Sequence, residues 1–165
     1  MNMMAVLAAT FIPLVIGFIW YSPKIGFGKA WMNATGMTEE KAKTSNMFLI
    51  FGLVTLFSFF VALIMQFLVI HQVHVYSLLS AQAEFKDPNS EAALMLEKFK
   101  SLFDSSYRTF KHGAFHGTLS GILLALPIVG VNALFEQKSF KYIAINAGYW
   151  ILCMALMGGV VCAFQ

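Results

Sequence analysis

The segment 47–70 reads MFLIFGLVTLFSFFVALIMQFLVI and contains no Asp, Glu, Lys or Arg. An apolar run of about 20 residues is long enough to cross the hydrocarbon core of a bilayer as an α-helix. Three further uncharged stretches of similar length occur at 3–22, 113–135 and 142–164. Runs this long and this continuously apolar predict helices, because the strands of a membrane barrel are shorter and alternate in polarity. We therefore expect an all-α protein, a polytopic four-transmembrane-helix bundle.

The composition supports one integral membrane domain over residues 1–165. Hydrophobic residues make up 59% of the chain and charged residues 12%, and the mean hydropathy is +0.72. One soluble core of this size could not bury that much apolar surface, so the excess is expected to face the lipid bilayer. The net charge of +3 is small and the basic residues form no stripe, so nucleic acid is not an expected partner.

Basic residues in the loops indicate the orientation of the helices. The two short loops, 23–46 and 136–141, lie on one side of the membrane and carry Lys24, Lys29, Lys41, Lys43, Lys138 and Lys141. Cytoplasmic loops are enriched in lysine and arginine near the ends of spans, so we expect these loops in the cytoplasm. Both termini then lie outside. The segment 3–22 has no basic residue before its apolar run and no small-residue cleavage pattern, so we read it as a retained first helix.

The middle segment 75–112 is polar enough to leave the membrane, yet its apolar residues recur at helical spacing. Its strongest helix breaker is the turn sequence Asp87-Pro88-Asn89-Ser90. We expect the second and third membrane helices to extend past the outer boundary and to meet at this turn as an extramembrane helical hairpin. In the first loop, Thr38 followed by Glu39 and Glu40 has the pattern of a helix start, and we expect the second membrane helix to begin there.

Four histidines flank the outer boundary, namely His71, His74, His112 and His116. Spacings of three and four residues place each pair on one helix face, and two such faces could hold a metal ion that prefers imidazole or could relay protons. A fully helical hairpin would offset the two pairs by about 9 Å along its axis, so the site requires the second arm to be partly non-helical. The alternative is that these are interfacial histidines whose polar tips reach the headgroups.

Other residues have the pattern of packing positions. Gly113, Gly117 and Gly121 repeat every four residues, which lets a second backbone approach the third helix closely. Pro13 and Pro127 each interrupt a membrane helix and can kink it. Polar side chains within the spans usually face the interior of a bundle and hydrogen-bond between helices, and they are Gln66, His116, Asn132 and Asn146.

Two separated motifs resemble a known family. The first is Trp20-Tyr21-Ser22-Pro23, which continues through Gly28 to Trp31 and has the aromatic character of a membrane interface. The second is Asn146-Ala147-Gly148-Tyr149-Trp150, and the dipeptide His116-Gly117 takes part in the resemblance as well. Together they resemble the bacterial membrane family called "domain of unknown function 1761". The resemblance implies a small multi-pass protein of the bacterial cytoplasmic membrane and assigns no activity.

No paired carboxylates, activated nucleophile or cofactor motif is present, so no catalytic residue is predicted and no cofactor is expected. No carboxylate or ammonium lies within a span, which argues against an ion-driven transporter. We therefore expect a structural or accessory subunit that packs against other membrane proteins or forms a homo-oligomer. The alternatives are a passive pathway for a small solute, lipid or ion, and a histidine metal site.

Overall fold

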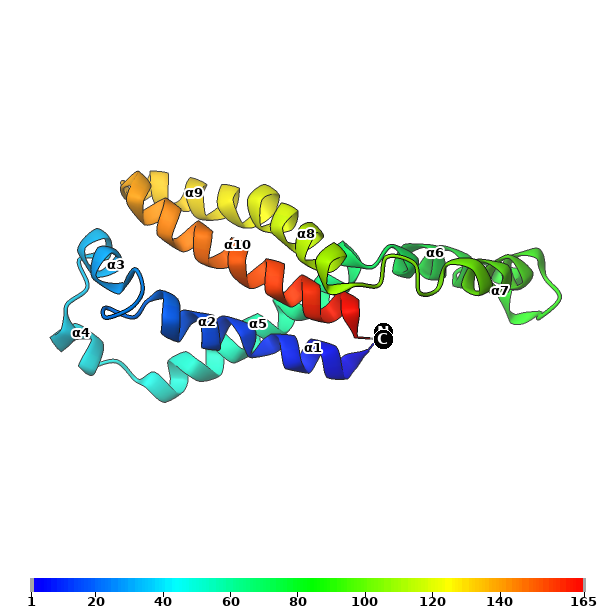
Figure 1. The fold of residues 1–165 in the computed structure, drawn as a ribbon, viewed down its shortest axis with the longest axis horizontal. Coiled ribbons are helices and arrows are strands. Elements are labelled where there is room, and N and C mark those ends of the chain that lie inside the picture. Colours follow the sequence, from blue (N-terminus) through cyan, green and yellow to red (C-terminus); the bar gives the residue numbers. More distant parts are fainter. Residues whose placement is uncertain (1, 165) are drawn as a thin grey trace.

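The computed structural model describes residues 2–164, with only the backbone at Glu39, and over that range it contains helices and connecting segments but no strand. Its four candidate membrane spans are Met3–Trp20, Met47–Val69, Phe110–Phe135 and Phe140–Ala163. They pack into the elongated bundle of Figure 1, with a helical hairpin at one end. The expected all-α architecture with four spans is confirmed, and each boundary lies within three residues of the expected one.

Prolines account for the irregular places in two of the spans. The first span consists of α1 (Met3–Thr10) and α2 (Ile12–Trp20), separated at Phe11 just before Pro13. The third consists of α8 (Phe110–Ser120), a π-helical turn η2 (Gly121–Ala125) and α9 (Leu126–Phe135), which contains Pro127. A proline has no N–H for the carbonyl four residues earlier, so the local hydrogen-bonding pattern must change on its N-terminal side.

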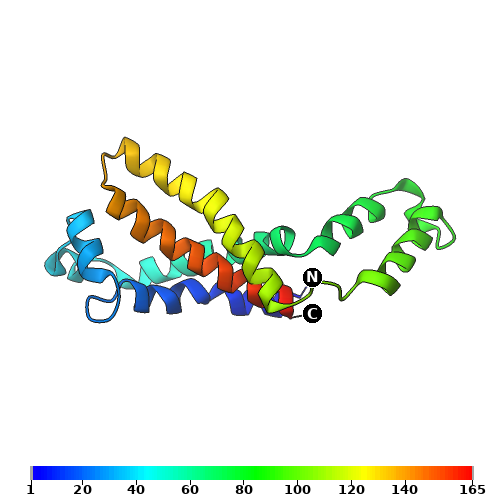
Figure 2. The same cartoon turned by 45° about the horizontal axis from the view of Figure 1, so that its top comes forward.

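The helix α10 (Phe140–Ala163) is the centre of the bundle. Over its most apolar window 56% of the residues are buried inside the protein, against 11% for the span formed by α5 (Met47–Val69). In Figures 1 and 2, α10 lies between α8–α9 on one side and α1–α2 on the other. The other three spans are therefore assembled around the last one.

The hairpin consists of α6 (His71–Ser80), a short 3-10 turn η1 (Ala83–Lys86) and α7 (Glu91–Phe103). Figure 2 shows its two arms projecting away from the bundle. The arms are not continuous with the membrane helices. Ile70 is extended and separates α5 from α6, while residues 104–109 form a non-helical connection between α7 and α8.

The first loop forms two short helices, α3 (Gly28–Thr35) and α4 (Glu39–Lys43). Gly36 ends α3 in the left-handed conformation at φ 70°, which a residue without a Cβ adopts without strain. Thr38 caps α4 by accepting a hydrogen bond from the Lys41 N–H, as its position predicts. The expectation that the second membrane helix begins here is wrong, because α4 ends at Lys43 and Asn46 caps a separate start for α5.

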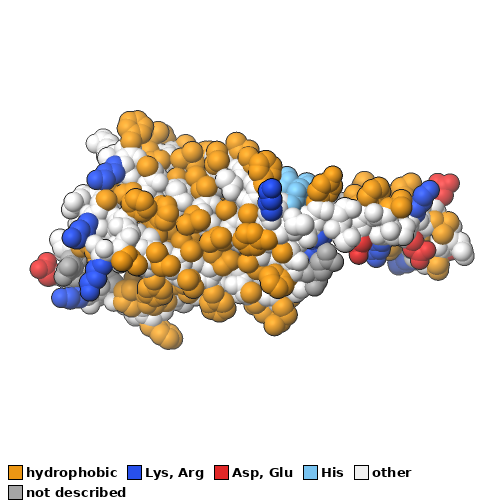
Figure 3. Space-filling view, in the orientation of Figure 1, with side chains coloured by type: hydrophobic (Ala, Val, Ile, Leu, Met, Phe, Trp, Pro, Cys, Tyr) orange, Lys and Arg blue, Asp and Glu red, His pale blue; other side chains and the backbone are white. Residues whose placement is uncertain are grey.

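Figure 3 shows how side chains of different kind are distributed over this shape. Hydrophobic side chains are spread over the face of the bundle that Figure 3 shows, as expected of a surface in contact with lipid. Lysines gather at the end of the bundle away from the hairpin, and histidines appear where the hairpin joins the bundle. The polarity of the surface thus divides the molecule into a lysine-bearing end, an apolar middle and a charged hairpin.

A three-histidine cluster at the base of the outer hairpin

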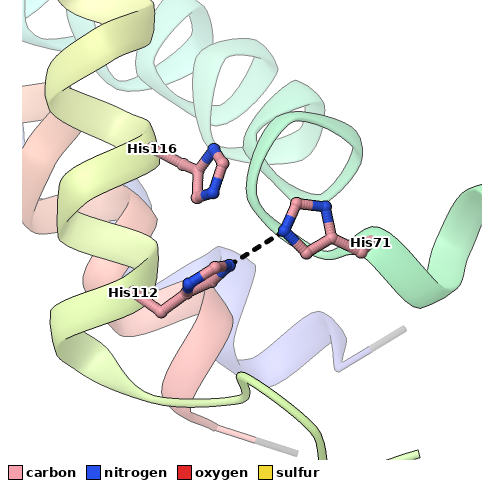
Figure 4. A group of neighbouring side chains, drawn as sticks. All are labelled: His71, His112 and His116. Carbon is pink, nitrogen blue, oxygen red and sulfur yellow. Dashed lines mark hydrogen bonds between the residues drawn. The ribbon is translucent and has the colours of Figure 1, made fainter. Parts of the chain in front are cut away.

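Three of the four histidines meet at the junction between the bundle and the hairpin. His71 is the first residue of α6, and His112 and His116 lie one turn apart near the start of α8. In Figure 4 the three rings point toward one another from these two helices. One nitrogen from each ring can be chosen so that all three lie within 4.8 Å of one another. We refer to His71, His112 and His116 as the histidine cluster.

The distances within the histidine cluster are close to those of a metal site. Two nitrogens that bind one tetrahedral zinc at about 2.0–2.1 Å each lie about 3.3 Å apart. The Nε2 atoms of His71 and His112 are 3.0 Å apart, close enough for one to donate a hydrogen bond to the other. The ring centroids of all three pairs lie between 4.5 and 5.0 Å. The histidine cluster thus combines three imidazole donors at a spacing that could hold a metal ion.

The non-helical break between α7 and α8 places His112 and His116 beside His71. The chain leaves the helical path after Phe103, and Tyr107 adopts a positive φ of 61° before Thr109 caps α8. The side-chain amide of Gln72 donates to the carbonyls of Phe103 and Ser106, at 2.8 and 2.7 Å, and fixes this connection against α6. The second arm of the hairpin is thus partly non-helical. The sequence predicted that a shared histidine site would require this break.

His74 does not join the cluster. Its Nε2 lies 2.8 Å from the carbonyl oxygen of Phe67, a carbonyl in the last turn of α5. Such carbonyls lack an intrahelical partner where a helix ends, and a side-chain donor can satisfy them. The structure therefore places His74 at the C-terminal end of α5, whereas the sequence grouped it with the other three.

The histidine cluster is open on one side and aromatic on the other. His71 is exposed, and His112 and His116 are partly exposed. The rings of Tyr107 and Phe115 lie 5.2 Å from His112 and 5.5 Å from His116, respectively. No Asp, Glu or Cys among the described residues joins this group of ligands. An ion held here would have imidazole ligands and access from the membrane surface.

The glycine repeat of the third span lies directly against α10. A Cβ added at Gly113 or Gly117 would overlap the carbonyl oxygens of Gly158 and Met154. At Gly121 it would lie 2.6 Å from the Cα of Ile151. The glycine face of α8 is therefore packed against α10 of the same chain. This contact holds α8, and with it His112 and His116, in place.

The two motifs of the family resemblance contact each other. The indole N–H of Trp20 donates to the Ile145 carbonyl at 3.1 Å, and the Tyr21 hydroxyl donates to the Asn146 side chain at 3.0 Å. Burial raises the pKa of Tyr21, so its hydroxyl keeps the proton that it donates. Trp31 packs edge-on against Tyr21 at 5.4 Å. These aromatic residues hold the first loop on α10 in addition to lying near the interface.

The remaining residues of the first motif shape the loop. The Gly28 N–H donates to the Ser22 carbonyl, and a Cβ at Gly28 would lie 2.5 Å from the nitrogen of Pro23. Ser22 also accepts a hydrogen bond from the Lys24 N–H through its side chain at 3.3 Å. The spacing between Pro23 and Gly28 is thus explained by a tight turn in which only glycine fits.

The four polar residues of the spans have different environments. Gln66 is 1% exposed, and both polar atoms of its side chain lack a hydrogen-bond partner. Asn146 is satisfied by Tyr21 and by the Tyr142 carbonyl. Asn132 is exposed near the end of its span, in contrast to the expected position inside the bundle. Of these four residues, only His116 belongs to a cluster that could bind a metal ion.

Two residues that complete the base of the hairpin were not identified from the sequence. Gln72 holds the connection between α7 and α8, and Arg108 donates to the carbonyls of Cys162 and Phe164 at the end of α10. A signal for the break was nevertheless present. Thr109 lies four residues before the third apolar run begins at Gly113, and a threonine shortly before such a run is a typical start of a helix.

Comparison with known proteins identifies the family. No curated protein and no solved structure matches this chain. The family described as "protein of unknown function (DUF1761)" matches residues 4–162, which cover the four spans except for Met3 and Ala163 and include the histidine cluster. The chain therefore belongs to the DUF1761 family of multi-pass membrane proteins.

Proposed function

We propose that this protein is a membrane-embedded binder of a transition metal ion and that the histidine cluster holds the ion. The observation that carries the proposal is the convergence of three imidazoles from two helices within 4.8 Å. Imidazole suits Zn²⁺, Cu²⁺ and Ni²⁺, whereas Mg²⁺ and Ca²⁺ prefer oxygen ligands. Zn²⁺ is the ion we favour, because three histidines are an established ligand set for it.

The position of the histidine cluster suggests what the ion does. His71 begins the hairpin and His112 follows it, so a shared ion would join the two ends of the outer hairpin to each other and to α8. Three protein ligands leave a fourth position of a tetrahedral ion open for water or for a ligand from a partner. No carboxylate of the described residues accompanies the ligands as a general base, so the role proposed for the ion is structural or regulatory.

Metal analysis of the purified protein tests the proposal. The protein is solubilised in mild detergent, treated with chelator, loaded with Zn²⁺ and measured by elemental analysis after gel filtration. We expect about one ion per chain. The variant His71→Ala should lose it, and His112→Ala should do the same, because each removes one ligand. His74→Ala is the matched control and should keep the ion, since His74 bonds to Phe67. Equal metal content in all four proteins would contradict the proposal.

An accessory role is a second proposal that the outer hairpin favours. The hairpin has strongly exposed apolar side chains outside the membrane, notably Leu78 at 66% and Leu102 at 60%. Exposed apolar residues in water, where no lipid covers them, often mark a surface that contacts another protein. The proposed partner is another membrane protein or a second copy of this chain.

Crosslinking in the native membrane tests the accessory role. A crosslinked band that Leu102→Ser removes would support it, provided that Lys98→Ser, an exposed change on the same helix, leaves the band unchanged. Recovery of the chain only as an uncrosslinked monomer would count against it.

A passive pathway has less support from the geometry. Three grooves of about 730, 680 and 310 Å³ lie on the described part of the surface. None of the three is lined by Gln66, His116, Asn132 or Asn146, the polar residues that a pathway through the bundle would use.

The proposed location is the bacterial cytoplasmic membrane, with the hairpin and the histidine cluster outside. The lysines at the opposite end of the bundle support this orientation. A single cysteine placed at Asn89, in the tip of the hairpin, tests it after Cys153 and Cys162 are replaced by alanine. An impermeant maleimide should label that cysteine in intact spheroplasts, and labelling only after lysis would reverse the orientation.

A further inference from the structure

The first half of α5 stands away from the bundle. None of its residues 47–57 is buried, whereas Ser58, Ala62, Met65, Gln66 and Val69 in the second half all are. The helix therefore makes its core contacts only near the hairpin end. Toward the lysine-bearing end, it leaves a wedge between itself, α2 and α10.

This wedge is a groove of about 680 Å³, within the range of sites that hold ligands of moderate size. Its walls are Leu14 and Gly17 of α2, Phe51 and Val54 of α5, and Tyr149 and Trp150 of α10. The Phe18 and Phe51 rings, 5.6 Å apart, connect the two walls on one side. The polar hydroxyl of Tyr149 is already engaged, because it donates to the Pro13 carbonyl at 2.8 Å. Among the described residues, the buried hydroxyl of Ser58 also lines the groove and has no hydrogen-bond partner. The groove thus offers a mainly apolar surface with this one unpaired hydroxyl inside the span.

Each wall belongs to a candidate membrane span, so the groove faces hydrocarbon and its occupant must come from the bilayer. The mouth of the groove is different in character. Tyr21, Ser22 and Trp31 line it, and these are residue types that lie at the level of lipid headgroups. Lys24 follows the mouth residue Pro23 directly, and Lys29 lies on α3 together with Trp31. Both lysines are exposed.

We propose that this groove binds one anionic phospholipid, with an acyl chain between α2, α5 and α10 and the phosphate beside Lys24 and Lys29. The apolar walls match the chain, and the lysines match the negative charge of the headgroup. This site is independent of the histidine cluster, which lies at the other end of the bundle. The lipid would supply the packing that the first half of α5 lacks.

Native mass spectrometry tests the proposal with defined lipids. The protein is reconstituted in vesicles of equal parts phosphatidylglycerol and phosphatidylcholine, extracted in mild detergent and analysed for retained lipid. We expect one phosphatidylglycerol per chain and an enrichment of at least about fivefold over phosphatidylcholine.

Variants that fill the groove have a matched control on α5. A Cβ at Gly17 would have Tyr149 as its nearest neighbour at 3.6 Å, so Gly17→Leu places its side chain in the groove without a backbone clash. Gly52 has no atom within 4 Å of an added Cβ and does not line the groove, which makes Gly52→Leu the control. Gly17→Leu should reduce retained lipid at least about fivefold, and Gly52→Leu should not. Val54→Trp fills the groove from the opposite wall. It replaces Gly17→Leu as the test if Gly17→Leu fails to fold.

A second set of variants tests whether Lys24 and Lys29 cause the preference for an anionic headgroup. The double variant Lys24→Gln, Lys29→Gln should bring retention of the two lipids to equality, whereas Lys138→Gln in the other short loop should leave the preference intact. Undiminished lipid in Gly17→Leu or Val54→Trp overturns the site in the groove. Equal retention of both lipids by the unmodified protein overturns the preference for an anionic headgroup.

Discussion

The Nε2 atoms of His71 and His112 lie 3.0 Å apart although 41 positions separate the two residues. Everything between them in the chain belongs to the outer hairpin and its connection to α8. The contact therefore closes the hairpin at its base, at the level where the bundle ends.

Zinc should stabilise the folded protein in detergent. An ion that binds only the native state adds about 2.7 kcal/mol to the free energy of unfolding at 100 times its dissociation constant. We expect a rise in melting temperature for the chelator-treated protein on addition of Zn²⁺. His116→Ala should abolish the rise, and His74→Ala should retain it. A rise of equal size in His116→Ala would show that the ion acts elsewhere.

Gly117→Ala should destabilise the bundle by about 1–3 kcal/mol, the usual cost of forcing extra volume into a packed contact. The added Cβ would overlap the Met154 carbonyl, and a backbone atom of a central helix cannot move aside as a flexible side chain can. Thermal unfolding in detergent measures the change. Gly130→Ala is the control, because nothing lies within 4 Å of that Cβ and alanine is the better helix former. Similar losses for both variants would contradict the assigned packing.

Replacing Gln66 with methionine should raise the free energy of unfolding by about 1–3 kcal/mol. Gln66 is 1% exposed and neither polar atom of its amide has a partner, so the native state carries the cost of burying that group unpaired. Methionine has a similar length and no such cost. Asn146→Leu should have the opposite effect, since it removes hydrogen bonds to Tyr21 and Tyr142. A loss of stability in Gln66→Met would mean that the amide has a partner in the membrane.

Arg108→Met should destabilise the protein by about 1.5–3 kcal/mol, the range for a hydrogen bond to a charged group. The Arg108 guanidinium donates to the Cys162 carbonyl at 2.9 Å and to the Phe164 carbonyl at 3.2 Å. A cation is also favourable at the C-terminal end of a helix. Limited proteolysis should show faster cleavage near residue 108. Lys111→Met, an exposed change in the same region, should leave both measurements unchanged.

The sequence predicted the spans well because hydropathy acts over a whole helix. The run at 47–70 and the helix Met47–Val69 differ by one residue, since lipid excludes charge over that full length. Local capping was predictable too, as at Thr38. The break between α5 and α6 at Ile70 was not predictable, because no glycine or proline lies near that point of the sequence.

The candidate site could be predicted only in part for the same reason. Helical spacing grouped His71 with His74, because spacing reports which residues share a face within one helix. Whether two faces meet depends on residues 104–109, where Gln72 and Arg108 fix the path through tertiary hydrogen bonds. No local pattern in the sequence indicates the groove beside α5, because the groove results from the angle between helices.

The two interruptions at Ile70 and 104–109 separate the helical hydrogen bonding of the hairpin from that of the membrane helices. A continuous helix would fix the rotation of each arm by the helical repeat of the span that it extends. Here, the path of each arm is set instead by tertiary contacts at the two interruptions, namely the hydrogen bonds of Gln72 and the contact between His71 and His112. Insertions or deletions within the arms would therefore change the length of the hairpin without changing the helical register of the four spans.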